Sequence, residues 1–155
     1  MLEGSRSSAE FERARELRPL IDEVGLLLDI HSMQTSIAPL MLAGPLAKVR
    51  DLAHPLGNPM YLVSDDGHSA GRRLRDYSDF GYSVSQKIDL LIECGQHWER
   101  ASADTSLQTT FQFLRACDAV GSELLNQHIV SESGRQIFIE MVEAVTIETK
   151  EFEFV

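Results

Sequence analysis

Three segments of the sequence combine an apolar run with ionisable residues that could support hydrolytic chemistry. Residues 26–32, 60–67 and 90–97 each start apolar and end in polar or charged side chains. Imidazole is a good zinc ligand, and a carboxylate can act as a general base toward a metal-bound water. His31 is therefore a candidate metal ligand, and Glu93 is a candidate catalytic base.

Two further side chains lie close enough in sequence to orient these groups. Asp29 and His31 point to one face of an extended strand because strand side chains alternate. A carboxylate can hold a ligating imidazole in its orientation, and His97 follows Glu93 closely enough to line the same pocket. A histidine or glutamate that ends a strand is more often only a polar terminus, so residue type alone does not establish these roles.

Positioning these residues requires strands that end at one edge of a sheet. Short apolar runs predict buried strands, and apolar residues at three- and four-residue spacing predict helices. Ligands bind beyond the carboxyl ends of strands in open α/β sheets, so we expect the three strand ends to meet at one edge. The expected strands are 25–32, 59–64 and 88–95, and the expected helices are 8–24 with a break or kink at Pro19, 45–53, 69–77 and 106–127, with 33–44 irregular.

The alternation of strands and helices predicts an α/β fold with a mostly parallel sheet flanked by helices. From residue 136 the sequence becomes rich in β-branched and aromatic residues, which is typical of antiparallel strands. We expect this tail to begin a C-terminal β subdomain. The predicted organisation is an α/β domain over 8–130 and the start of a β domain over 131–155.

Composition restricts the function further. The 155 residues are 43% apolar, and 14 basic against 24 acidic residues give a net charge of -10, which argues against a nucleic-acid partner. The longest apolar stretch, 37–47, contains two prolines and a glycine, so no membrane span is predicted. With no apolar leader and no CxxC pair for Cys94 and Cys117, we expect a cytoplasmic protein.

Several motifs together resemble one enzyme family. They are Leu-Asp-Ile-His-Ser at 28–32, Gly-Arg-Arg-Leu-Arg-Asp-Tyr at 71–77, Leu-Ile-Glu-Cys-Gly-Gln at 91–96 and Val-Glu-Ala-Val-Thr-Ile at 142–147. In this order and at this rough separation, they are similar to motifs of the succinylglutamate desuccinylase/aspartoacylase family. The resemblance covers residues 8–155.

The resemblance implies a carboxypeptidase-like fold of the zinc peptidase kind around one zinc ion. His31 would be one of three protein ligands, and Glu93 would take a proton from water and pass it to the leaving amine. An arginine would hold the substrate carboxylate, with Arg72, Arg73 and Arg75 all left open as candidates. His68, with His97, would line the pocket for a small N-acyl amino acid.

One part of the family's pattern is absent from this sequence. The family takes two zinc ligands from an early H-x-x-E motif, and none of the five histidines here is followed by glutamate at the third position. The family's Asn-Arg pair for the substrate is also missing. We therefore expect a chain shortened at both ends relative to that family, with weak or no activity alone and with exposed strands that favour homo-oligomers.

Two classes of function remain open from the sequence. One is a zinc-dependent deacylase acting on the amide or ester bond of a small N-acyl amino acid. The other is a metal-free, non-catalytic α/β binding or assembly module. A composite metal site built from His31, His68, His97 and a carboxylate such as Asp65 is a weaker third hypothesis, and no residue identifies the acyl group or the amino acid.

Overall fold

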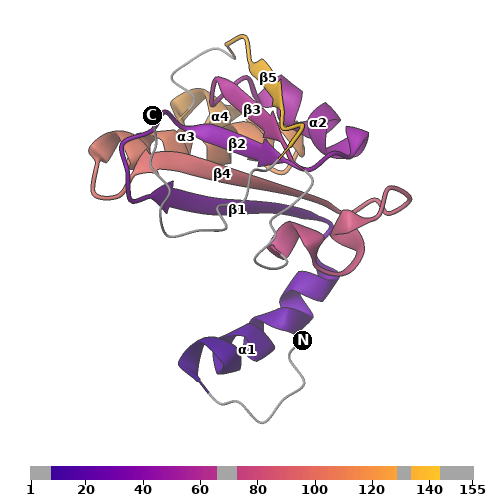
Figure 1. Cartoon of the computed structure of the whole chain (residues 1–155). Helices are drawn as coiled ribbons and strands as arrows, with labels where there is room; N and C mark the ends of the chain where they lie inside the picture. The colour runs from indigo at the N-terminus through magenta and orange to yellow at the C-terminus, as the bar shows by residue number, and fades with distance from the viewer. Residues whose placement is uncertain (1–7, 66–72, 129–133, 144–155) are drawn as a thin grey trace.

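The computed structural model describes residues 8–65, 73–128 and 134–143. Strands and helices alternate over most of this range, as Figure 1 shows. The elements are α1 (Ala9–Glu23), β1 (Leu26–Met33), β2 (Leu40–Ala43), α2 (Ala47–Ala53), η1 (His54–Leu56), β3 (Tyr61–Ser64), η2 (Leu74–Asp76), η3 (Ser78–Gly81), β4 (Ile88–Gln96), α3 (Arg100–Ala116), α4 (Ser122–His128) and β5 (Ile137–Glu140), where η marks a 3-10 helix.

The five strands form one sheet in the order β1-β4-β2-β3-β5 (Figure 1). The pairs β1–β4, β2–β3 and β3–β5 are parallel, whereas β2–β4 is antiparallel. The predicted α/β fold with a mostly parallel sheet flanked by helices is therefore confirmed. The single antiparallel pair divides the sheet into two halves whose strands run in opposite directions.

The apolar core lies on one face of the sheet. Met41, Leu62 and Leu90 are buried there against Val49 of α2 and Phe113 of α3. Because side chains alternate along a strand, the residues on either side of Leu90 point to the opposite face. The two faces of β4 therefore differ: one packs in the core, and the other carries charged side chains.

Helix α1 extends away from the sheet and has no buried residue (Figure 1). Ser8 caps its first turn by accepting a hydrogen bond from the Phe11 amide at 3.3 Å. Its last turn is held by Asp22, which accepts from the Tyr77 hydroxyl at 2.7 Å and, through its carbonyl, from Lys87 Nζ at 2.5 Å. The helix continues through Pro19, so it is not interrupted there, and a kink at this residue stays a prediction.

Besides the interruption expected at Pro19, three secondary-structure predictions differ from the structure in the first 128 residues. Residues 33–44, predicted irregular, contain β2. The helix predicted over 106–127 starts earlier, at Arg100, and is divided into α3 and α4. Asp118 has φ 51°, a left-handed conformation that ends a helix, which explains the division. Of the helix predicted at 69–77, the described part holds only η2.

The tail also differs from its prediction. Strand β5 joins the edge of the main sheet parallel to β3, so the expected antiparallel pairing is wrong for these four residues. Residues 144–155, where the rest of the predicted β subdomain falls, lie outside the described residues. The boundary between residues 130 and 131 stays a prediction. Among the helices that the structure describes, none has the length and apolarity to cross a membrane.

Candidate active site

The register of β1 and β4 brings three of the predicted residues together. His31 lies opposite Glu93 in the parallel pair, so both side chains project from the same face. His31 Nδ1 is 3.9 Å from Glu93 Oε1, and His31 Nε2 is 3.1 Å from Asp29 Oδ1. The imidazole therefore sits between two carboxylates, one from its own strand and one from the neighbouring strand.

Glu93 has the least exposed side chain of these three residues. Its side chain is 20% exposed, and Oε2 is buried without a hydrogen-bond partner in the described part of the chain. Burial raises the pKa of the Glu93 carboxyl, and the charge of Asp29 raises it further. The charges of His31 and, to a smaller extent, His97 lower it. A carboxyl group with a raised pKa and an unpaired oxygen is suited to exchanging protons with a bound molecule.

A cavity of about 450 Å³ opens beside this pair. It lies between the carboxyl ends of β1 and β4 and the start of α3, and its walls include His31, Ser32 and His97. Ser32 Oγ and His97 Nδ1 are 2.6 Å apart, so His97 is tied to β1 across the cavity mouth. The predicted roles of Asp29 and His97 in orienting His31 stay predictions, although the structure places both residues at this end of the sheet.

Gly95 shapes the turn from β4 into α3 below this cavity. Its φ is +112°, and a Cβ at this position would lie 3.0 Å from Ser102 Oγ. The Ser102 hydroxyl donates a 2.6 Å hydrogen bond to the Gln96 carbonyl, which fixes the start of α3 against the strand. A glycine directly after Glu93 and Cys94 is therefore required by backbone geometry.

The expectation that all three strand ends share one edge is wrong. β3 runs opposite to β4, because it is parallel to β2 and β2 is antiparallel to β4. Asp65, which follows β3, therefore lies at the other end of the sheet from the His31 and Glu93 pair. The composite metal site that combined Asp65 with His31 is excluded by this topology.

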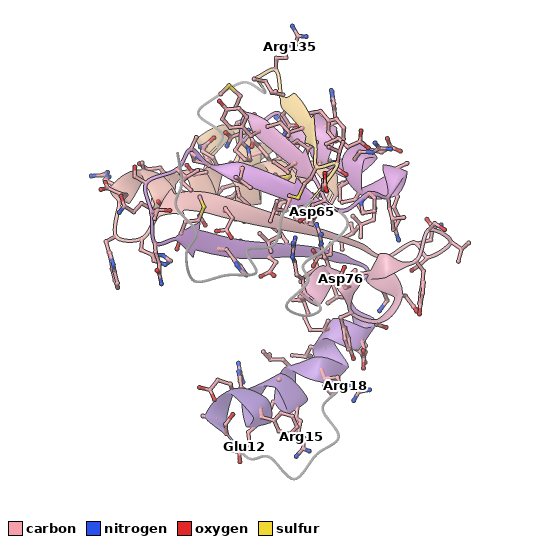
Figure 2. All side chains as sticks on the ribbon, in the orientation of Figure 1. Glu12, Arg15, Arg18, Asp65, Asp76 and Arg135 are labelled. Atoms are coloured by element: carbon pink, nitrogen blue, oxygen red, sulfur yellow. The ribbon has the colours of Figure 1, made fainter. Side chains whose placement is uncertain are left out.

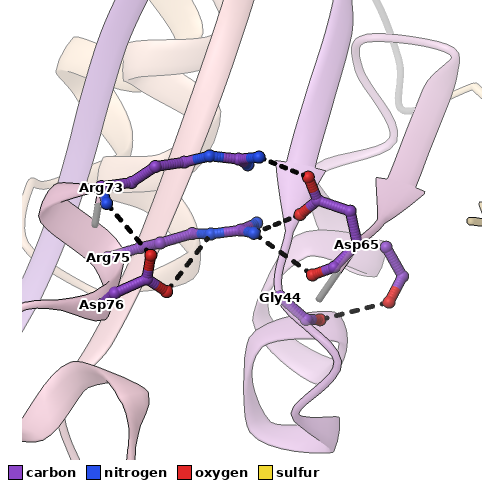
Figure 3. Close-up of polar contacts among 6 residues, drawn as sticks. Gly44, Asp65, Arg73, Arg75 and Asp76 are labelled. Carbon is purple, nitrogen blue, oxygen red and sulfur yellow. Dashed lines mark hydrogen bonds and ion pairs between the residues drawn. The ribbon is translucent and has the colours of Figure 1, made fainter. Parts of the chain in front are cut away.

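Arg75, a predicted substrate-binding residue, lies with Asp65 at that other end. Asp65 accepts hydrogen bonds from Arg73 Nη2 at 2.7 Å and, at closer range, from Arg75 Nη2 (Figure 3). Figure 2 shows Asp65 and Asp76 near the sheet, apart from Arg15 and Arg18 on α1. Arg75 does not line the cavity at His31, so its predicted role gains no support from this arrangement.

Two other predicted residues, His68 and Arg72, lie outside the described residues. Within residues 8–65, 73–128 and 134–143, no group of three or more His, Cys, Asp or Glu side chains is arranged to hold a metal ion. A catalytic zinc site needs about three protein ligands. The side chains in these ranges, with one imidazole held between two carboxylates, therefore do not by themselves fit the expected zinc.

The sequence interpretation missed Asp89, a buried carboxylate on β4. Its exposed fraction is 3%, and it lies four residues before Glu93 on the same face of the strand. A signal was present, because residues 89, 91 and 93 share one face and an aspartate inside an apolar run must find a partner or a cavity. Asp89 lies near the start of its strand, so a rule that places sites at strand ends does not select it.

Comparison with solved structures shows the fold. The apo structure of the ectoine utilization protein EutE (DoeB) from Ruegeria pomeroyi matches with a TM-score of 0.62 and 16% identity, over 90% of this chain and 44% of that chain. A succinylglutamate desuccinylase/aspartoacylase from Rhodobacter sphaeroides matches with a TM-score of 0.55 and 15% identity, over 72% of this chain and 34% of that one.

Succinylglutamate desuccinylase from Vibrio parahaemolyticus also matches, with a TM-score of 0.57 and 16% identity, over 98% of this chain and 46% of that one. No family model and no curated protein matches the sequence. The chain spans less than half the length of these solved structures. It has the fold of succinylglutamate desuccinylase/aspartoacylase structures, and this confirms in three dimensions the resemblance seen in its sequence.

Proposed function

We propose that this chain carries the proton-transfer half of a deacylase site, with Glu93 as the catalytic base for hydrolysis of a small N-acyl amino acid. The observation that carries the proposal is the Glu93 carboxylate itself. It is partly buried, its Oε2 has no hydrogen-bond partner among the described residues, and it faces His31, which lines the cavity of about 450 Å³. The shared fold with deacylases supports the same interpretation.

The chemistry assigned to Glu93 is a two-step proton transfer. Glu93 takes a proton from a water molecule whose oxygen attacks the amide carbonyl carbon, and the C–N bond then breaks. The same proton passes to the leaving nitrogen, so a carboxylic acid and a free amine are the products. Glu93 suits both steps because burial keeps its pKa above the ordinary value of 4.5.

His31 contributes to the charge balance at this position. Its imidazole lies between Asp29 and Glu93, at 3.1 Å and 3.9 Å respectively. Zinc dependence is part of the proposal, with His31 as the one imidazole ligand that the described residues supply. Because these residues do not complete a three-ligand set, we expect slow turnover by the chain alone.

The test is hydrolysis of N-acetyl-L-aspartate and N-succinyl-L-glutamate by the purified chain, with and without added zinc, followed by NMR detection of the free amino acid. Glu93→Gln should lower the rate by about 100-fold or more, since general-base catalysis contributes about 10²–10⁴. Glu23→Gln, an exposed glutamate near the end of α1, is the matched control and should leave the rate unchanged.

The metal component has its own measurement. Plasma mass spectrometry of the purified chain should find zinc that is lost in His31→Ala if His31 is a ligand. Turnover that is equal in Glu93→Gln and in the unmodified chain would overturn the assignment of Glu93. Absence of both zinc and turnover would favour the alternative function, a metal-free, non-catalytic binding or assembly module.

A further inference from the structure

A second cavity, of about 200 Å³, lies at the other end of β4. Its walls come from the segment that follows β2, from η2 and η3, and from the start of β4, and they include Leu46, Phe80 and Asp89. It shares no lining residue with the cavity at His31. It is therefore a separate site, and any ligand that it holds is independent of the proposed deacylase function.

Two buried charged side chains line this cavity with polar atoms left unpaired. Asp89 is 3% exposed, and within the described residues neither carboxylate oxygen has a hydrogen-bond partner. Arg75 is 6% exposed, and its Nη1 and Nε likewise lack a hydrogen bond there. Buried polar groups nearly always have hydrogen-bond partners, because an unpaired one has lost its hydration without compensation. A molecule in the cavity would supply both partners.

The charges around the cavity favour a cationic partner. Arg75 and Arg73 both pair with Asp65, and Arg75 Nε is 3.9 Å from Asp76 Oδ1 (Figure 3). With Asp89, these residues comprise two cations and three carboxylates, so one negative charge is left over. That charge falls on Asp89, the only member of the five without an ion pair in the described part of the chain.

The titration of Asp89 agrees with this count. The pKa of Asp89 is raised to about 7, first by burial and then by the charge of Asp29, while Arg75 opposes the increase and Asp76 adds to it. Burial and the nearby carboxylates thus outweigh Arg75, so the charged form of Asp89 would be stabilised by a further cation. A ligand ammonium group would provide that cation and complete the hydrogen bonding of the carboxylate.

We propose that this cavity binds a small molecule with a protonated primary amine and a nearby acceptor oxygen. The amine would donate to the Asp89 carboxylate, and the oxygen would accept from Arg75 Nη1. Leu46, Val49 and Phe80 supply apolar walls for the few carbon atoms that join the two groups. The volume is below the usual ligand range of about 300–1,000 Å³, which restricts the ligand to the size of a small amino acid or amino alcohol.

The test is isothermal titration calorimetry on the full chain at pH 8, where Asp89 is ionised. The probes are glycine and ethanolamine, with betaine and acetate as controls that lack an N–H donor. Saturable binding of glycine or ethanolamine, without binding of betaine or acetate, is expected. Binding of glycine alone would show that the acceptor oxygen of the ligand belongs to a carboxylate. Binding of both probes would show that the site also accepts amino alcohols.

Asp89→Asn removes the charge at nearly constant volume and should weaken amine binding about tenfold or more, since hydrogen bonds to charged groups contribute about 1.5–3 kcal/mol. Asp51→Asn, an exposed aspartate on α2, should bind like the unmodified chain. If Asp89→Asn fails to fold, the probe series on the unmodified chain decides alone. Equal binding of betaine and glycine, or no amine binding at millimolar concentration, would overturn the proposal and leave a cavity filled with water.

Discussion

A carboxylate of β4 lies near a basic side chain at each end of the strand, but the two ends differ in how deeply these groups are buried. At the carboxyl end, Glu93 and His31 are partly exposed, and His31 lines a cavity of about 450 Å³. At the amino end, Asp89 and Arg75 are nearly fully buried around a cavity of about 200 Å³. Four residues separate Glu93 from Asp89, about 13 Å at the rise of a strand.

This difference shows that residue type does not decide the role of a charged group in a sheet. Glu93 lies where two parallel strands end, so its charge is partly solvated and it can reach a ligand from solution. Asp89 lies under η2, where its charge depends on the arginines and on whatever occupies the cavity. The carboxyl end of β4 at Glu93, the open end, is suited to exchanging protons with a bound molecule. The amino end at Asp89, the closed end, is suited to retaining a small charged molecule.

The largest expected effect concerns Asp89. The folded chain keeps the Asp89 proton up to a pH of about 7, whereas the unfolded chain releases it near the ordinary pKa of 3.8. Folding therefore takes up a proton in this window, and the free energy of unfolding falls as pH rises from about 4 to about 7. One pKa unit corresponds to about 1.4 kcal/mol, so the loss reaches at most about 4 kcal/mol.

Asp89→Asn should remove this pH dependence and be more stable than the unmodified chain at pH 8. Urea unfolding at pH 4 and at pH 8 measures it, with Asp51→Asn as the control that retains the slope. An unchanged slope in Asp89→Asn would show that the closed end does not hold a destabilised carboxylate, and the contrast between the two ends would fail.

Arg75→Met should destabilise the chain by about 3 kcal/mol. Removing one partner of a buried ion pair usually costs about 3–5 kcal/mol, and the low end applies because Arg73 still pairs with Asp65. Arg18→Met on α1, where the arginine is half exposed, should change stability by less than about 0.5 kcal/mol. Thermal unfolding followed by circular dichroism compares the two variants, and equal effects would contradict a buried pair at this end.

Gly95→Ala should cost about 2 kcal/mol at the open end. The residue has φ +112°, where a side chain is strained, and the new Cβ would meet Ser102 Oγ at 3.0 Å. Gly25→Ala is the matched control, since a Cβ there meets nothing within 4 Å. Urea unfolding should show loss of stability only for Gly95→Ala, and a similar midpoint for both variants would refute the strained turn.

The smallest effect concerns the titration of Glu93. NMR of the side-chain carboxyl carbon should show that Glu93 titrates above its ordinary pKa of 4.5 because it is buried. His31 lowers the Glu93 pKa, so His31→Ala should move the titration to higher pH. His54→Ala, an exposed histidine in η1, should leave it in place. A titration that does not move would mean that His31 and Glu93 are not coupled.

The sequence by itself determined the three strands β1, β3 and β4, the helices α1 and α2, and one pair of site residues. Continuous apolar runs are stable only when they are removed from water. For this reason residues 26–33, 61–64 and 88–96 form strands of the sheet close to the predicted ranges. His31 and Glu93 meet as expected, because each follows a comparable apolar run and the two strands pair in parallel register. The local apolar pattern and the parallel pairing of two neighbouring strands are sufficient to bring these two residues together.

Only the tertiary structure decided which strand ends face one another. Strand direction depends on the pairing of β2 with β4, and β2 is four residues long with no local signal strong enough to predict it. That one antiparallel pair moves Asp65 and its arginines to the opposite end from His31 and Glu93. Burial of Asp89 is decided in the same way, because the sequence determines only the residue type, while the environment that sets its pKa is made by segments that are distant along the chain.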